Sequence, residues 1–271
     1  MSLNLEQTTD FVIKRATDLV DRLVKSRGRE EPPFLAEELA QLQGIKKIVK
    51  ADLGKASALL LRSHEEYIIK VNQNHHPVRQ NFSCAHEIGH TFVDELQQMV
   101  PRGNTDLRMP RSDIQGQAVE RLCNIAAAEL LMPEPTFKKY LSRFGLSVSS
   151  VEWLAHTFWV SLPAVAIRIA EVSEEPCIAI LWQQSRGTKP GHRLAWCTGP
   201  GRESKEKIRY RPVTTYAREP SSVLKAYHDY GIIKSFKEFR LGNVTKRYYM
   251  ESKGFGRNHN RYVVSLVFPD R

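Results

Sequence analysis

The sequence has little cysteine and no long apolar run. Only four of its 271 residues are cysteine, and they are widely separated, which favours reduced thiols over a disulfide framework. No apolar run reaches the roughly 18 residues that a membrane-spanning helix needs, and the polar first ten residues argue against a secretory signal. Internal repeats and low-complexity tracts are also absent, which excludes a solenoid. The sequence therefore predicts a cytoplasmic protein without a membrane partner.

Acidic residues are scarcer than basic ones: 30 Asp and Glu stand against 40 Lys and Arg, for a formal net charge of +10. Residues 171–271 hold 19 basic and 10 acidic residues, so nearly all of the excess lies in the last hundred positions. This asymmetry predicts a second unit that faces an anionic partner such as nucleic acid. A solvated basic surface is the alternative interpretation.

Hydrophobic residues make up 41% of the chain, enough for a packed core, and their spacing predicts an α+β fold. The helices expected in the first part are residues 8–26, 34–44, 79–99, 113–132, 134–143, 148–157 and 161–171. The strands expected there are 45–52, 57–62 and 66–72, and residues 100–112 are expected to form a long loop. Later strands are expected over 177–183, 193–198, 236–241, 245–251 and 260–268, with a helix over 219–229.

A change in sequence character near Ser173 divides the chain. We expect a mostly helical domain with a small β-sheet over residues 1–133. A short helical segment over 134–172 and a basic α+β domain over 173–271 are expected to follow.

The segment before this boundary resembles a helix-turn-helix. A turn at Trp159 and Val160 separates two helices, and Ser161 is placed to cap the second one. That second helix offers Arg168 as its single cationic side chain for reading base edges. The favoured role is therefore to support the first domain or to dock a partner.

Residues 86–90 carry the pattern His-Glu-Ile-Gly-His inside an expected helix. Side chains four residues apart share a helix face, so His86 and His90 offer imidazole nitrogens to one metal ion. Glu87 lies beside them, where a carboxylate takes the proton of the attacking water. The pattern predicts metal-assisted hydrolysis with Glu87 as the general base. Nitrogen and carboxylate ligands suit Zn²⁺, and they suit Mn²⁺ as well.

Two histidines leave a catalytic zinc one protein ligand short. Glu120 follows His90 by thirty residues, with a segment between them long enough for the next helix to fold back on the first. Asn124 comes one turn later on the same face and is placed to orient a ligand. We expect Glu120 to be the third ligand, the alternative being a solvated helix carboxylate. Glu129 lies too far along the helix to share a metal with it.

Other residues near the pattern have simpler expected roles. Cys123 is placed to act as a further ligand or a redox sensor, but a packed core thiol is the favoured interpretation. Cys84 is expected to pack, and His75 and His76 are expected to be exposed in a polar turn. Gly89 lacks a side chain, which is expected to let a strand or a substrate backbone approach the helix closely.

The two helices together resemble the signature segments of the ImmA/IrrE family of zinc metallopeptidases. The resemblance rests on RQNFSCAHEIGHTF at residues 79–92 and VERLCNIAAAELLMP at 119–133, in the family's order. It implies a zincin-like fold in which the two histidines and Glu120 bind zinc and Glu87 is the general base. In gluzincin-like members the ligand glutamate comes from this second helix.

The radiation-response branch of the family joins a peptidase domain, a helix-turn-helix-like segment and a GAF-like sensor domain. The resemblance therefore implies that residues 173–271 form such a sensor. It also implies the function of a zinc endopeptidase whose protein substrate is a helix-turn-helix transcriptional repressor, so that cleavage derepresses stress-response or mobile-element genes.

A second hypothesis is a nucleic-acid-binding regulator in which the metal site is structural. Basic and aromatic positions alternate at residues 234–240 and 245–257, where they are placed to neutralise and stack on nucleic acid. Stoichiometric zinc that is lost in a His90→Ala variant would favour the enzyme.

Overall fold

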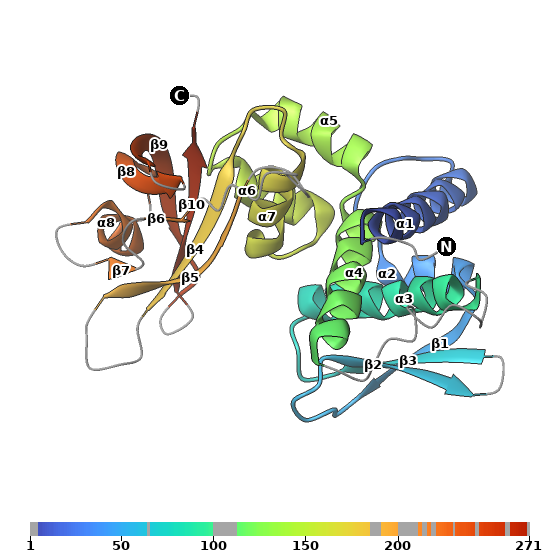
Figure 1. The fold of residues 1–271 in the computed structure, drawn as a ribbon. Coiled ribbons are helices and arrows are strands. Elements are labelled where there is room, and N and C mark those ends of the chain that lie inside the picture. Colours follow the sequence, from blue (N-terminus) through green and yellow to red (C-terminus); the bar gives the residue numbers. More distant parts are fainter. Residues whose placement is uncertain are drawn as a thin grey trace. The chain divides into compact units, whose positions relative to one another are not determined.

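The computed structural model describes residues 5–63, 66–99, 113–184, 191–199, 211–212, 216–217, 221–229, 231–241, 244–257 and 261–269. The chain forms two compact units (Figure 1). The first unit holds Met1–Thr136 with Thr157–Val160, and the second holds Phe137–His156 with Ser161–Arg271. The expected loop at 100–112 lies outside the described residues.

Helices and one three-stranded sheet make up the first unit (Figure 1). Its elements are α1 (Leu5–Arg27), α2 (Ala36–Leu42), β1 (Ile45–Ala51), β2 (Ala58–Ser63), β3 (Glu66–Asn72), α3 (Pro77–Met99) and α4 (Asp113–Leu131). These elements confirm the α+β prediction, and the three strands begin and end within one residue of the expected bounds. Gly44, the last residue of the helix expected over 34–44, has a φ of 81° and leads the chain into β1.

The small sheet has the order β1-β3-β2. Its central strand, β3, pairs in parallel with β1 and antiparallel with β2, with Ile69 opposite Ile48 on one side and Leu60 on the other. Strand β2 is therefore an edge strand, and α3 packs against β2 and β3. This arrangement brings the edge of the sheet to the helix that carries the two histidines.

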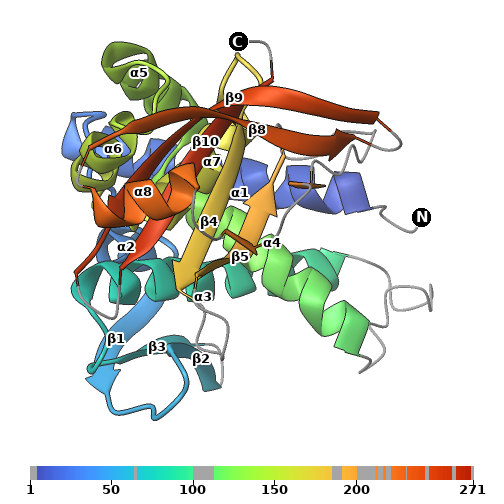
Figure 2. The same cartoon turned by 90° about the vertical axis from the view of Figure 1, so that its left-hand side faces the viewer.

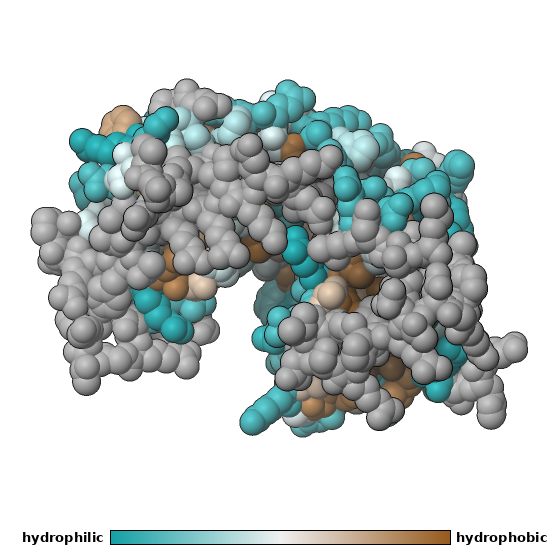
Figure 3. Space-filling view, in the orientation of Figure 1, coloured by the Kyte–Doolittle hydropathy of each residue, from teal (hydrophilic) through white to brown (hydrophobic). Residues whose placement is uncertain are grey.

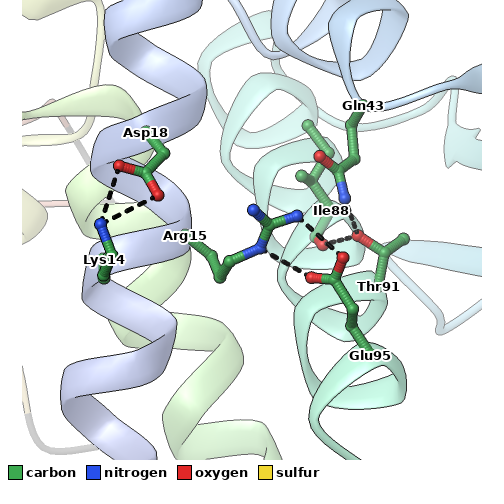
Figure 4. A network of polar contacts seen from close by, with 7 residues as sticks. All are labelled: Lys14, Arg15, Asp18, Gln43, Ile88, Thr91 and Glu95. Atoms are coloured by element: carbon green, nitrogen blue, oxygen red, sulfur yellow. Dashed lines mark hydrogen bonds and ion pairs between the residues drawn. The ribbon is translucent and has the colours of Figure 1, made fainter. Parts of the chain in front are cut away.

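Two polar contacts fix α3 from other elements (Figure 4). Arg15 on α1 donates two hydrogen bonds to the Glu95 carboxylate, at 2.7 and 2.8 Å. The Thr91 hydroxyl donates to the carbonyl of Ile88 at 2.7 Å and accepts from the Gln43 amide at 3.1 Å. Because these contacts come from α1 and from the end of α2, they fix the position of α3 within the first unit.

The second unit combines short helices with a seven-stranded sheet. Its elements are most of α5 (Glu134–Phe144) and α6 (Ser150–Phe158), with α7 (Leu162–Val172), β4 (Ile178–Gln184), β5 (His192–Thr198), β6 (Arg211–Pro212), β7 (Tyr216–Ala217), α8 (Ser222–His228), β8 (Ile233–Leu241), β9 (Val244–Phe255) and β10 (Tyr262–Phe268). The strand order is β6-β8-β9-β10-β4-β5-β7, and every neighbouring pair is antiparallel. Helix α8 covers one face of this sheet, over a core that includes Trp182, Phe239, Met250 and Val263 (Figure 2).

Helices α6 and α7 form the expected bent pair, with 107° between them. Trp159 has a φ of 53° at the turn, and Ser161 caps α7 by accepting a hydrogen bond from the backbone of Ala164 at 3.3 Å. Arg168, however, is buried, with only 1% of its side chain exposed, and its guanidinium lies 3.6 Å from the Glu171 carboxylate. The one cation that α7 was expected to offer is therefore not presented at the surface.

Among the described residues, no single helix is long and apolar enough to cross a membrane, and only α6 and α7 taken together reach that length and composition.

Candidate metal centre

His86 and His90 lie one turn apart on the same face of α3, as their spacing predicts. Their ring centroids are 5.1 Å apart with the rings steeply inclined, so the two imidazoles converge without stacking. Burial lowers the pKa of His90, and the neighbouring His86 lowers it further. A neutral imidazole keeps a lone pair for a metal ion, so the environment favours the ligating form of His90.

Helix α4 brings a carboxylate to the same two rings. The Glu120 oxygens lie 3.2 Å from Nε2 of His86 and 3.6 Å from Nε2 of His90. Ligand atoms about 2.0–2.1 Å from a tetrahedral zinc ion are separated from one another by about 3.3 Å. The two nitrogen-to-oxygen distances, 3.2 and 3.6 Å, are close to this value, so these three side chains could hold one metal ion.

Asn124 fixes the orientation of the His86 ring through its Nδ1 atom. Its Oδ1 lies 3.0 Å from Nδ1 of His86, and because an amide oxygen only accepts, Nδ1 must carry the proton. In the neutral ring with this tautomer, the Nε2 atom that faces Glu120 keeps its lone pair, as a metal ligand requires. The structure thus brings Asn124 to the position that its spacing from Glu120 suggested.

Residues 41–170 match the sequence profile of the IrrE N-terminal-like domain, a peptidase family. This stretch contains both metal-site helices, α3 and α4. Residues 41–170 therefore resemble the metallopeptidase domain of the ImmA/IrrE family.

Curated relatives of this domain carry metalloprotease names. The chain is 34% identical over 117 residues to the radiation response metalloprotease IrrE of Deinococcus radiodurans. The aligned residues make up 42% of this chain and 34% of the relative. It is 27% identical over 135 residues to the metallopeptidase ImmA of Bacillus subtilis. These aligned residues make up 49% of this chain and 72% of the relative. The chain thus spans about a third of the length of the first relative.

One solved structure resembles the whole fold. A transcriptional regulator of Mycobacterium tuberculosis superposes with a TM-score of 0.60 at 15% identity, over 99% of this chain and 81% of that one. At this identity the likeness is one of fold alone.

Glu87 follows His86 on α3, at the position that the resemblance implies for the general base. Its side chain is largely buried, and burial raises the pKa of the carboxyl, an effect that the nearby Glu120 reinforces. His86 and a hydrogen bond from the backbone of Leu60 act in the opposite direction. A raised pKa brings a carboxylate closer to the range in which it can both accept and return a proton.

The hydrogen bond from Leu60 could not be foreseen from the sequence. Leu60 lies on the edge strand β2, and nothing in its local sequence indicates contact with a residue on α3. The strand order could have indicated it, because an edge strand has N–H groups that point away from the sheet, and β2 lies beside α3.

Gly89 has a different neighbour from the one expected. An added Cβ would lie 3.0 Å from the Ala126 Cβ and 3.0 Å from the Cys123 Cα, both on α4. The expectation of a strand or substrate backbone at this position was wrong, since the close approach is made by helix α4, which crosses α3 here (Figure 1). The missing side chain lets α4 come near enough for Glu120 to reach the histidines.

Three of the remaining candidates have structural roles, and the fourth lies at the site. Cys84 is buried, as expected, and burial raises the pKa of its thiol to about 12. Glu129 is buried too and accepts a hydrogen bond from the backbone of Glu134 at 3.1 Å, so it caps α5. His76 accepts from the backbone of Val78 at the start of α3. The fourth candidate, Cys123, lies beside both metal-site histidines.

Proposed function

We propose that this chain is a zinc-dependent endopeptidase. The observation that carries the proposal is the Glu120 carboxylate, which faces Nε2 of both histidines from a second helix while Glu87 lies beside them. His86, His90 and Glu120 would hold the ion. When bound, zinc supplies polarisation of the attacking water and of the scissile carbonyl.

The protein's own groups provide the proton transfers. The Glu87 carboxylate takes the proton of the attacking water and delivers it to the leaving amine. Its burial excludes competing water and raises its pKa, which suits both halves of that transfer. Asn124 keeps His86 in the tautomer that leaves Nε2 free.

The edge strand β2 offers a binding surface for an extended peptide. It pairs with β3 on one side only, and the Leu60 N–H on it reaches Glu87, so its open edge runs beside the reacting groups. A substrate segment that adds to this edge as a strand would bring its backbone to the metal. Leu59 and Leu61 are 43% and 38% exposed, and hydrophobic residues reach the surface over this sheet (Figure 3). We therefore propose apolar side chains in the bound segment.

The substrate class follows from the family resemblance. We propose a helix-turn-helix transcriptional repressor, whose cleavage would derepress stress-response or mobile-element genes in the cytoplasm. Co-incubation with repressors encoded beside this gene, followed by mass spectrometry of the products, tests the substrate. A Glu87→Gln variant should bind zinc as the wild type does and leave the repressor intact. Cleavage by that variant at the wild-type rate would refute the mechanism.

A second function is favoured by the exposed end of β8 and β9. Phe236 is 59% exposed, the Arg247 guanidinium lies 5.7 Å from its ring centroid, and Lys234 is exposed two residues before it on the same face. An exposed ring flanked by cations can stack on a base while the cations neutralise phosphates. We propose that this face binds single-stranded nucleic acid, in addition to the peptidase activity.

Fluorescence anisotropy with a single-stranded oligonucleotide and the full chain tests this second function. Phe236→Ala should weaken binding by about 1–3 kcal/mol per stacked base, and affinity should fall steeply with salt. Trp153→Ala is the matched control, because Trp153 is also an exposed aromatic residue of the second unit but stacks on Phe144 in α5. Equal binding by the wild type and Phe236→Ala would exclude this face.

A further inference from the structure

An exposed cation, Arg62, lies on the edge strand beside the metal site. Arg62 is paired with Tyr67 of β3, and side chains that are directly opposite each other lie on the same face of a sheet. The Tyr67 hydroxyl donates a hydrogen bond to Asp94 on α3 at 3.0 Å. The Arg62 side chain therefore lies on the face of the small sheet that packs against α3.

The ring of Tyr67 holds the guanidinium in place. The central guanidinium carbon of Arg62 lies 5.6 Å from the centre of the ring, which is the distance of a cation–π contact. Asp94, which fixes the other end of the same ring, follows His90 by one turn of α3. A short chain of contacts thus links Arg62 to the helix that carries the two histidines.

The charge of Arg62 is available to a bound molecule. The nearby Glu66 carboxylate pairs with Lys46 at 2.6 Å, and Glu95 pairs with Arg15. Among the residues that the structure describes, Arg62 has no ion-pair partner, and its side chain is exposed. A guanidinium in this state is suited to a carboxylate, which it binds through two parallel hydrogen bonds.

We infer that Arg62 binds a glutamate or aspartate side chain of the substrate. The inference rests on the proposed function, because it concerns the peptide segment that adds to β2. The Leu60 N–H points out of the sheet toward Glu87, and backbone groups alternate in direction along a strand, so those of Arg62 face the same open edge. Two residues of strand span about 7 Å. The acidic residue should therefore lie about two positions from the scissile bond.

The surroundings confine this preference to one position of the segment. Closer to the metal, an acidic side chain would meet the like charges of Glu87 and Glu120, which disfavours it there. The neighbouring peptide residues point to the opposite face of the sheet, where the exposed Leu59 and Leu61 favour apolar side chains. The structure thus assigns a bound segment in which one acidic residue stands between apolar ones.

Cleavage of a proteome-derived peptide library by the zinc-loaded full chain, with the sites identified by mass spectrometry, tests the inference. We expect Asp and Glu to be enriched about 1.5- to 5-fold at one position two residues from the scissile bond, the range of an exposed ion pair. Arg62→Glu should abolish this enrichment and favour Lys and Arg there instead. Lys47→Glu is the matched control, because it makes the same change of charge at an exposed residue of β1, on the other side of β3. It should keep the wild-type profile.

The outcomes separate this inference from the proposed function. Cleavage by the wild type without acidic enrichment at that position, or equal enrichment in Arg62→Glu, would overturn the role of Arg62 and leave the peptidase proposal intact. Failure of the zinc-loaded wild type to cleave any peptide of the library would overturn both. If Arg62→Glu does not fold, Arg62→Gln decides the matter: loss of the enrichment supports the inference, and its persistence refutes it.

Discussion

Gly89→Ala is the substitution that tests most directly how the fold builds the site. Ordinary contacts between carbon atoms are about 3.5–4.0 Å, yet a Cβ at this position would lie 3.0 Å from two carbons of α4, one of them in the backbone. The helices must therefore separate by about 0.5 Å or more, and overpacking of this kind costs about 1–3 kcal/mol. Opposing this, alanine gains about 1 kcal/mol over glycine inside a helix.

Gly116→Ala provides the matched control. Gly116 also lies inside a helix, α4, but an added Cβ there would meet nothing within 4 Å. Only the gain in helix propensity therefore remains. The difference in unfolding free energy between the two variants then isolates the packing cost, which we expect to be about 1–3 kcal/mol in favour of Gly116→Ala. Urea denaturation of the metal-free proteins measures it.

The same variant should weaken metal binding. Separation of the helices moves Glu120 away from the two imidazoles by about 0.5 Å, whereas metal–ligand distances tolerate about 0.2 Å. We expect zinc affinity to fall by roughly tenfold or more in Gly89→Ala, equivalent to about 1.4 kcal/mol, and to be unchanged in Gly116→Ala. Competition with a chelating dye measures both. Equal stability and equal zinc affinity in the two variants would refute the view that close crossing of α3 and α4 positions Glu120.

Three further predictions concern the metal site. Asn124→Ala removes the acceptor that fixes the tautomer of His86, so zinc affinity should fall about 10- to 100-fold in dye competition while Asn124→Asp retains most of it. Because the base form of Glu87 is the active one and burial raises its pKa, cleavage should decline as pH falls through a value above 4.5, and an acid limb at or below pH 4.5 would contradict this assignment. Removal of zinc by a chelator should lower the stability of the first unit, by about 2.7 kcal/mol if free zinc had been at 100 times its Kd. Hydrogen exchange should then quicken in α3 and α4 and stay unchanged in β4 and β10.

The parts of the site that follow from local spacing could be predicted from the sequence. His86 and His90 are four residues apart, and helix geometry alone puts them on one face. Glu120 and Asn124 required a further step, that α4 folds back against α3, and the length of the segment between the two helices was enough to suggest it. The strands of the small sheet were also predictable, because their apolar runs are short and bounded by turn residues.

Contacts between elements that are distant in sequence were not predictable. The identity of the element that approaches Gly89 depends on how α3 and α4 cross, and the contact of Leu60 with Glu87 depends on which strand forms the edge of the sheet. Arg168 is a similar case, since its position on α7 suggested an exposed cation while packing buries it beside Glu171. In each case tertiary packing overrides a pattern that is correct locally.

Charge determines how these side chains would share one metal ion despite their mutual repulsion. Burial raises the pKa of the Cys123 thiol, and Glu120 and Glu87 raise it further. Burial also raises the pKa of Glu87, to which Glu120 adds, so the metal-free cluster resists ionisation. A divalent cation would remove this conflict: with two neutral imidazoles and the Glu120 carboxylate, a Zn²⁺ ion would give a ligand set with a net charge of +1. The Glu87 carboxylate beside it would offset that charge, in the place where a base is required.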